Sequence, residues 1–337
     1  MVHVSGASEA MENRPLGQSG IRASVVAFGG GPIGGPPWGN VDETQALAAI
    51  HSSLDEGVNL IDTAPVYGFG TSEELVGKAI AGRRDKVFIA SKCGLVWHSS
   101  KGVPFHKQFC GKTVYRYLGP ESIRYEIEQS LRRLGTDYID LYQTHWQDST
   151  TPISATMGIL LDLKREGKIR AIGVSNCTVD QLREYQSVGS IDSAQEKYNM
   201  LDRKIESDLA PFCRRETVAV LAYTPLAEGL LTGKVGSARE FPVGDLRHDR
   251  PQFAPEMRFR VQQMLEEMRP VAESYNITLS QLAIAWTVCQ AGISHALVGA
   301  RNVAQACENA KAGSLVLRAA DLEMLEAILT KHNVTAN

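Results

Sequence analysis

The chain has 337 residues, of which 43% are apolar and 22% charged, and its formal net charge is −3. This composition is typical of a globular protein with a sizeable core and argues against disorder. The charge gives no electrostatic footprint for nucleic acid or an anionic membrane, and no stretch reaches the roughly 18 consecutive apolar residues of a membrane helix. We therefore expect neither nucleic acid nor a membrane as a partner.

Six cysteines are scattered along the chain, without a CxxC pair and without Cys/His pairs at zinc-ligand spacing. Scattered cysteines in a chain of this length indicate reduced thiols, so we expect a cytoplasmic protein with no metal site. The N-terminus lacks a basic region followed by an apolar one, which argues against a signal peptide. We interpret residues 1–10 as a flexible leader and residues 11–337 as one domain.

Short runs of aliphatic and β-branched residues alternate with longer amphipathic stretches. Such runs are typical of strands covered on both faces. The expected strands are 25–28, 59–63, 87–91, 139–144, 169–174, 193–198, 219–223 and 295–299. The expected helices are 44–56, 72–81, 121–134, 153–166, 179–187, 204–215, 255–275 with 279–290, and 303–312, with a further helix at 320–330. Eight strands, each followed by a helix, predict an α/β fold, a single-domain (β/α)₈ TIM barrel.

Two features are expected at the ends of these elements. Ser72 is expected to cap the helix whose first turn holds Glu73 and Glu74. The connections 93–119, after the third strand, and 226–254, after the seventh, are too long for plain turns. Both follow the C-terminal end of a strand, where barrel enzymes place their sites. We expect these long loops to close over substrate or cofactor, with simple surface loops as the alternative.

Four polar side chains fall at the C-terminal ends of three successive expected strands. Asp62 and Tyr67 belong to Asp62-Thr-Ala-Pro-Val-Tyr67-Gly68, Lys92 follows the third strand, and His145 follows the fourth. Each alone has a structural explanation, such as capping a turn, packing at a rim or reaching solvent. Their joint placement predicts that they point into one cavity.

These residue types suit a proton donor for carbonyl reduction. A tyrosine has an ordinary pKa of about 10, too high for efficient proton donation near neutrality. A neighbouring ammonium lowers the pKa of the phenol, and a carboxylate keeps that ammonium in place and charged. We therefore expect Lys92 and Asp62 to tune Tyr67, and His145 to orient a carbonyl oxygen.

Motifs in order along nearly the whole chain, from about residue 14 to 329, carry a family resemblance. They are Gly29-Gly30-Gly31, Asp62…Tyr67-Gly68, Ser91-Lys92, Leu131-Arg-Arg-Leu-Gly-Thr-Asp-Tyr138, Gly173-Val-Ser-Asn176, Gln195…Tyr198-Asn199, Tyr223-Thr-Pro-Leu226 with Gly229…Lys234, and Gly299-Ala-Arg301…Glu308-Asn309. The sequence resembles the aldo-keto reductase superfamily. Its short tail after Arg318 is similar to the bacterial and potassium-channel β-subunit-like branch.

The resemblance implies a (β/α)₈ barrel that uses NADPH/NADP+ and a catalytic tetrad of Asp62, Tyr67, Lys92 and His145. Tyr67 is then the general acid in reduction and the base in oxidation, while hydride passes directly between nicotinamide and substrate carbon. Twelve positions match cofactor contacts. They are Ser175, Asn176 and Gln195 for the carboxamide, Tyr223 for stacking, Leu226, Gly229 and Lys234 for the pyrophosphate segment, and Gly299, Arg301, Gln305, Glu308 and Asn309 at the adenosine end.

The choice between NADPH and NADH rests on few residues. Arg301 is well placed for a 2′-phosphate, because a guanidinium offers a bidentate fork and a helix N-terminus follows. Gln305, however, stands where many relatives carry an arginine. We expect NADPH, with NADH left open.

The expected function is reduction of an aldehyde or ketone, including bulky, sugar-like or ring ketones, to the alcohol. Two alternatives stay open on the same scaffold: an NAD-dependent aldose 1-dehydrogenase and a cofactor-sensing binding subunit with slow turnover. Four aromatic side chains are expected to wall the substrate pocket, namely Trp38, Phe69, Trp97 and Trp146. The 93–119 insertion is expected to set specificity, and the sequence leaves open whether the chain forms a homo-oligomer.

Overall fold

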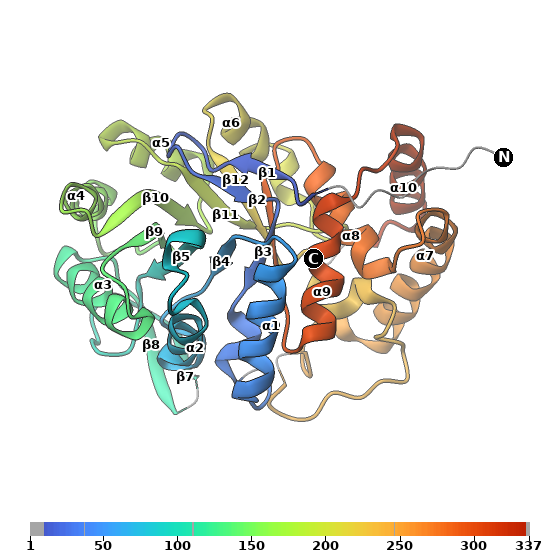
Figure 1. The fold of residues 1–337 in the computed structure, drawn as a ribbon, viewed down its shortest axis with the longest axis horizontal. Helices are drawn as coiled ribbons and strands as arrows, with labels where there is room; N and C mark the ends of the chain where they lie inside the picture. The colour runs from blue at the N-terminus through green and yellow to red at the C-terminus, as the bar shows by residue number, and fades with distance from the viewer. Residues whose placement is uncertain (1–9, 37, 110, 246, 335–337) are drawn as a thin grey trace.

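Eight strands form a closed, all-parallel barrel (Figure 1). The computed structural model describes residues 10–36, 38–109, 111–245 and 247–334, so the expected leader lies outside the described residues except for Ala10. Around the barrel the strands are β3 (Val26–Gly29), β4 (Leu60–Asp62), β5 (Phe88–Cys93), β9 (Ile139–Thr144), β10 (Ile169–Ser175), β11 (Ser193–Lys197), β12 (Ala219–Tyr223) and β13 (His295–Gly299). Pairing of β13 with β3 closes the barrel.

The helices surround the barrel and follow the strands in the chain. They are α1 (Glu43–Asp55), α2 (Thr71–Ile80), α3 (Pro120–Leu134), α4 (Ile153–Arg165), α5 (Val179–Val188), α6 (Leu209–Arg215), α7 (Pro255–Ser274), α8 (Leu279–Cys289), α9 (Val303–Lys311) and α10 (Ala319–His332). The expected α/β fold, a single-domain (β/α)₈ barrel, is confirmed, and each expected barrel strand is present with ends within two residues of those expected.

Two expectations about helix boundaries are wrong. Ser72 does not cap α2, which follows Gly70; its buried Oγ donates instead to the Gly30 carbonyl at 2.8 Å. The expected helix 204–215 is divided into a short 3-10 turn, Lys204–Glu206, and α6. The division occurs because the Asp208 side chain accepts the N–H of Leu209 and starts a new helix there.

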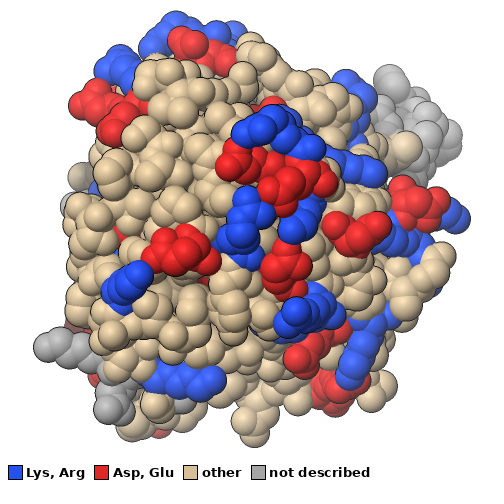
Figure 2. All heavy atoms as spheres, turned by 90° about the vertical axis from the view of Figure 1, so that its left-hand side faces the viewer, with Lys and Arg blue, Asp and Glu red and all other residues tan. Residues whose placement is uncertain are grey.

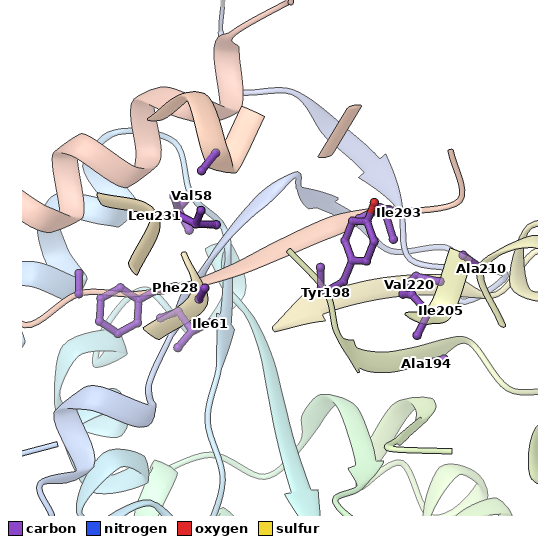
Figure 3. Close-up of a cluster of buried hydrophobic side chains, with 14 of the residues drawn as sticks. Phe28, Val58, Ile61, Ala194, Tyr198, Ile205, Ala210, Val220, Leu231 and Ile293 are labelled. Carbon is purple, nitrogen blue, oxygen red and sulfur yellow. The ribbon is translucent and has the colours of Figure 1, made fainter. Parts of the chain in front are cut away.

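The two faces of each barrel strand pack differently, because side chains alternate along a strand. Small and aliphatic side chains fill the barrel interior, as at Ala27, Leu60 and Leu141. The neighbouring residues face the helices in a second, larger layer. Figure 3 shows part of that layer, with Phe28 and Ile61 near Leu231, and Tyr198 and Val220 further along.

A β-hairpin absent from the sequence expectations covers the N-terminal end of the barrel (Figure 1). Strands β1 (Asn13–Pro15) and β2 (Arg22–Ser24) pair antiparallel. Leu16 and Ala23 from this hairpin are fully buried against the interior residues of the barrel. The hairpin therefore acts as a plug at the end opposite to the long loops.

The 93–119 connection is also more ordered than expected. It forms a small sheet in which β8 (Lys112–Arg116) lies between β6 (Leu95–Val96) and β7 (Val103–Phe109). Figure 1 shows this sheet and the 226–254 connection at the same end of the barrel, away from the β1–β2 hairpin. Both long connections thus border the C-terminal ends of the strands.

The face drawn in Figure 2 carries acidic and basic side chains interspersed with one another. Ion pairs occur among the charged side chains of the described residues, such as Arg124 with Glu166 at 2.8 Å. Within the part of the chain that the structure describes, we find no helix that is both long and apolar enough to cross a bilayer.

Candidate active site

A buried ion pair lies at the C-terminal ends of β4 and β5. Lys92 Nζ donates to both carboxylate oxygens of Asp62, at 2.9 and 2.7 Å, and to the Thr63 carbonyl at 3.0 Å. Lys92 is completely buried, and burial lowers the pKa of its ammonium. The negative charge of Asp62 raises that pKa, and the net direction is upward. The ammonium therefore stays charged throughout the neutral range.

Tyr67 sits directly above this ion pair. Its hydroxyl lies 3.3 Å from Lys92 Nζ. A left-handed turn follows, with φ of +65° at Gly68, where a Cβ atom would overlap the Gly34 carbonyl oxygen. Burial raises the pKa of the Tyr67 phenol, whereas the charge of Lys92 lowers it, and the net direction is upward. The expected lowering by Lys92 is thus present, but burial outweighs it.

His145 follows β9 and presents its ring edge-on to that of Tyr67, with centroids 5.8 Å apart. Burial and the nearby charge of Lys92 hold the pKa of His145 well below its usual value. The backbone of His145 is fixed on both sides: its N–H donates to the Cys93 carbonyl at 2.8 Å and its carbonyl accepts from Asn176 Nδ2 at 2.9 Å. The imidazole is therefore neutral at neutral pH, and it projects from a backbone that is held at both its N–H and its carbonyl.

These groups border a cavity of about 450 Å³ at the C-terminal end of the barrel. Asp62, Tyr67 and His145 line it, and Lys92 lies beneath. The structure also brings all twelve residues expected at the cofactor to this cavity: Ser175, Asn176, Gln195, Tyr223, Leu226, Gly229, Lys234, Gly299, Arg301, Gln305, Glu308 and Asn309.

The expected aromatic wall is divided between two cavities. Trp38 and Trp146 line the main cavity, but Phe69 and Trp97 border a second cavity of about 210 Å³. Gly68 and Phe69 form a left-handed turn after Tyr67. The Phe69 ring packs edge-on against Trp97, with ring centroids 4.8 Å apart. The expectation that all four line one pocket is therefore corrected for Phe69 and Trp97.

The carboxamide candidates are tied to one another and to the ion pair. Gln195 Nε2 donates to Asp62 Oδ1 at 2.8 Å. Tyr223 donates its hydroxyl to Asn176 Oδ1 at 2.8 Å, and Ser175 Oγ donates to the Gln195 carbonyl at 2.7 Å. The side chains of Ser175, Asn176 and Gln195 thus form a prearranged set of donors and acceptors in the cavity that Tyr67 lines.

The remaining cavity lining fits a dinucleotide with its charged phosphates. Positive φ values recur after β12, at Thr224, Ala227, Glu228 and Gly229, and such backbone concavities favour anions. The Thr224 hydroxyl is buried without a hydrogen-bond partner. Basic side chains gather on the same cavity, namely Lys234, Arg239, Arg247 and Arg301.

Sequence reasoning missed Thr224, Arg239 and Arg247 in this cavity. The signal was present, because the 226–254 connection was expected to close over a cofactor, but its arginines were not singled out. The side chain of Arg301 donates to the Trp38 carbonyl at 2.9 Å, and its backbone N–H donates to Gln305 Oε1 at 3.0 Å. Across the described residues, no cluster of three or more His, Cys, Asp or Glu side chains could hold a metal ion.

Comparison with known proteins matches this geometry to one family. The aldo/keto reductase family profile matches residues 25–330. The chain belongs to the aldo/keto reductase family. Family members are NAD(P)H-dependent oxidoreductases that act on carbonyl and alcohol groups, so the chain is an enzyme of that class.

Individual relatives differ in cofactor and substrate. An NADH-specific methylglyoxal reductase of Escherichia coli (strain K12) is 42% identical over 94% of this chain and 99% of its own length. A glycerol dehydrogenase of Gluconobacter oxydans superimposes with a TM-score of 0.86 at 36% identity, covering 98% of this chain and 97% of the other. An aldo/keto reductase of Klebsiella pneumoniae, in complex with NADP and acetate, has a TM-score of 0.69 at 28% identity, with 93% and 94% covered.

Proposed function

We propose that this reductase converts a small aldehyde or ketone to the corresponding alcohol, with Tyr67 as the proton donor. The observation that carries the proposal is the arrangement of Tyr67, Lys92 and Asp62 at one edge of the cavity, with the Tyr67 hydroxyl 3.3 Å from the ammonium. A bound reduced nicotinamide would supply the hydride for the carbonyl carbon. Tyr67 gives its phenol proton to the carbonyl oxygen, so that carbonyl, reduced cofactor and one proton yield alcohol and oxidised cofactor.

The residues around Tyr67 each contribute a separate effect. The neutral imidazole of His145 can donate a hydrogen bond to the carbonyl oxygen and hold it near the phenol. When the proton leaves, the charge that develops on the phenol oxygen faces the Lys92 ammonium, which is itself fixed by Asp62. Hydride transfer is favoured by holding the reacting atoms together, rather than by nucleophilic chemistry of the chain.

The raised pKa of Tyr67 favours the reductive direction, because the phenol keeps its proton at neutral pH. The similarity to a glycerol dehydrogenase supports alcohol oxidation as a second candidate, which requires the phenolate. The similarity to a methylglyoxal reductase supports small aldehydes that carry a second carbonyl as first substrates to assay. Aldehyde-dependent oxidation of reduced cofactor by the purified protein tests the reaction, and its absence across a broad carbonyl panel would contradict the proposal.

For the cofactor, we propose NADPH, with the 2′-phosphate bound by Arg301. Two features of Arg301 support this proposal. It lies beside the first turn of α9, where a helix N-terminus favours an anion. Its guanidinium donates to the Trp38 carbonyl and not to a carboxylate, so its positive charge is not neutralised by that partner. Lys234, in contrast, lies 3.5 Å from Glu308. The NADH-specific relative supports NADH as the alternative.

A titration of intrinsic Trp fluorescence separates these two cofactors. If Arg301 binds the 2′-phosphate, Arg301→Ala weakens NADPH binding by about 10-fold or more, since a hydrogen bond to a charged group contributes about 1.5–3 kcal/mol. NADH binding stays unchanged. Arg214→Ala, on the exposed end of α6, is the matched control. Equal affinity of the wild type for NADH and NADPH, with no effect of Arg301→Ala, would make NADH the cofactor to pursue.

A further inference from the structure

A buried carboxylate lies behind the turn that carries Asn176. Glu196 follows Gln195 on β11, and because side chains alternate along a strand, Gln195 faces the barrel interior while Glu196 faces outward. Glu196 Oε1 accepts the backbone N–H of Cys177 at 2.9 Å, and the side chain is 7% exposed. The backbone N–H of Asn176 donates to the Gln195 carbonyl at 3.2 Å. The Glu196 carboxylate and this backbone bond together fasten the first residues after β10 to the neighbouring strand.

Asn176 lies in the turn that Glu196 borders. Its φ of +55° is left-handed, a conformation that asparagine adopts more readily than other non-glycine residues. Its side chain connects both sides of the cavity, because Nδ2 donates to the His145 carbonyl at 2.9 Å and Oδ1 accepts from the Tyr223 hydroxyl at 2.8 Å. A shift of this turn would therefore move groups on both sides of Tyr67.

The surroundings of Glu196 leave its charge without a paired cation among the described residues. Burial raises the pKa of Glu196 to about 7, against the opposing effect of the nearby backbone N–H groups of Cys177 and Asn176. The groups near it from other elements are the thiols of Cys177 and Cys213 and the phenol of Tyr223. All three have raised pKa values and are neutral, and on β11 itself Lys197 is paired with Asp202 at 3.0 Å. Glu196 is thus the group in this region that changes charge near neutrality.

We propose that Glu196 is a positioning residue, which holds Asn176 in place for the nicotinamide carboxamide. The inference rests on the function proposed above. An ionised carboxylate is a stronger acceptor than a neutral acid, so protonation of Glu196 loosens the turn. Cofactor binding favours the ionised form, and affinity therefore falls as the pH drops through about 7.

The test compares NADPH dissociation constants from about pH 5.5 to 8.5 for the wild type, Glu196→Gln and Glu184→Gln. The control residue, Glu184, is exposed on α5, the helix that follows the same turn. The 2′-phosphate of NADPH has a second pKa of about 6, and its titration contributes equally to binding by all three proteins. We expect the control to follow the wild type, whose affinity falls about fivefold toward low pH, as the difference between charged and neutral hydrogen bonds implies. In Glu196→Gln, we expect NADPH affinity to fall toward low pH only by the part that titration of the 2′-phosphate causes.

A second measurement is made on the protein without cofactor and needs no variant. The amide proton of Cys177 should change its NMR chemical shift with a midpoint near pH 7, as its acceptor titrates. Glu196→Gln should not lower the melting temperature at pH 8, because removing an unpaired buried charge does not destabilise the fold there. A variant that melts earlier but keeps the wild-type pH profile of binding would show a merely structural role.

The outcomes separate this inference from the proposed function. If the wild type binds NADPH and Glu196→Gln has the same pH profile as Glu184→Gln, the role of Glu196 is overturned and the reductase proposal stands. If the wild type binds no nicotinamide cofactor, while the Cys177 amide still titrates, the function itself is overturned.

Discussion

At the residue scale, the protonation of Tyr67 decides which of the two reactions starts from the populated form of the site. The phenol is buried beside Lys92, whose charge lowers the pKa of Tyr67, and Asp62, whose charge raises it; burial is the largest effect and also raises it. A pKa above the ordinary tyrosine value means that the proton is held through the whole neutral range. Reduction then starts from the form of Tyr67 that is already populated.

This protonation gives a directional pH dependence. Below the raised pKa of Tyr67, the fraction of phenol stays near one while the fraction of phenolate grows about tenfold per pH unit. We expect the reduction rate kcat to be nearly flat from about pH 7.5 to 9, and the oxidation rate to rise steadily over the same range. Initial rates with saturating cofactor in both directions measure this. An oxidation rate that reached a plateau below pH 9 would show a lowered pKa instead.

Sequence could predict the residues of the site better than their surroundings. Asp62, Tyr67, Lys92 and His145 fall at strand ends, and the parallel barrel brings such ends together whatever the loops do. The direction of Phe69 was not predictable, because it depends on the left-handed turn begun by Gly68. The sign of the pKa shift of Tyr67 also needed the structure, since burial has no local sequence pattern.

At the element scale, the barrel strands were predictable and the added strands were not. Several barrel strands, such as β3, β12 and β13, are apolar on both faces, so their sequence runs are nearly continuous. In contrast, β1 and β2 have three residues each, and β6 has two, too few for a periodic pattern. The β1–β2 hairpin also buries Leu16 and Ala23 against the barrel interior, a contact that only the folded barrel provides.

We propose that the small sheet in the 93–119 connection helps to select substrates. Phe105, on β7, lies against Trp146 with ring centroids 5.3 Å apart, and Trp146 lines the main cavity. The sheet therefore supports one wall of the cavity without contributing to the carboxamide group of residues.

Shortening this sheet should alter specificity and leave the cofactor site intact. We expect replacement of residues 101–113 by a short Gly/Ser linker to change the ratio of kcat/KM between a bulky and a small aldehyde by about fivefold or more, because apolar pocket contacts discriminate on that scale. The NADPH dissociation constant should stay the same. A substrate preference identical to that of the wild type would refute this role for the sheet.

At the scale of the whole molecule, the hairpin that closes the barrel and the cavity that holds the candidate active site lie at opposite ends of the barrel. The β1–β2 hairpin plugs the N-terminal end with Leu16, and the cavity opens at the other end (Figure 1). Barrel enzymes commonly divide their two ends in this way.

This division predicts a substitution that affects folding alone. Leu16→Ala should lower the free energy of unfolding by about 2–5 kcal/mol, because it leaves a cavity among fully buried side chains. The kcat and KM of the folded enzyme should remain at wild-type values. Chemical denaturation and initial rates measure the two effects, with exposed Gln18→Ala as the control. A large loss of kcat in folded Leu16→Ala would show that the two ends are coupled.

The most direct test of the central claim is Tyr67→Phe, which removes one hydroxyl from the cavity. We predict that kcat for aldehyde reduction falls by about 10²- to 10⁴-fold, the usual contribution of a general acid, while the NADPH dissociation constant is unchanged. Tyr125→Phe, on the exposed face of α3, is the control that should behave as the wild type. If Tyr67→Phe kept wild-type turnover, Tyr67 would not be the proton donor, and the account of this site would be contradicted.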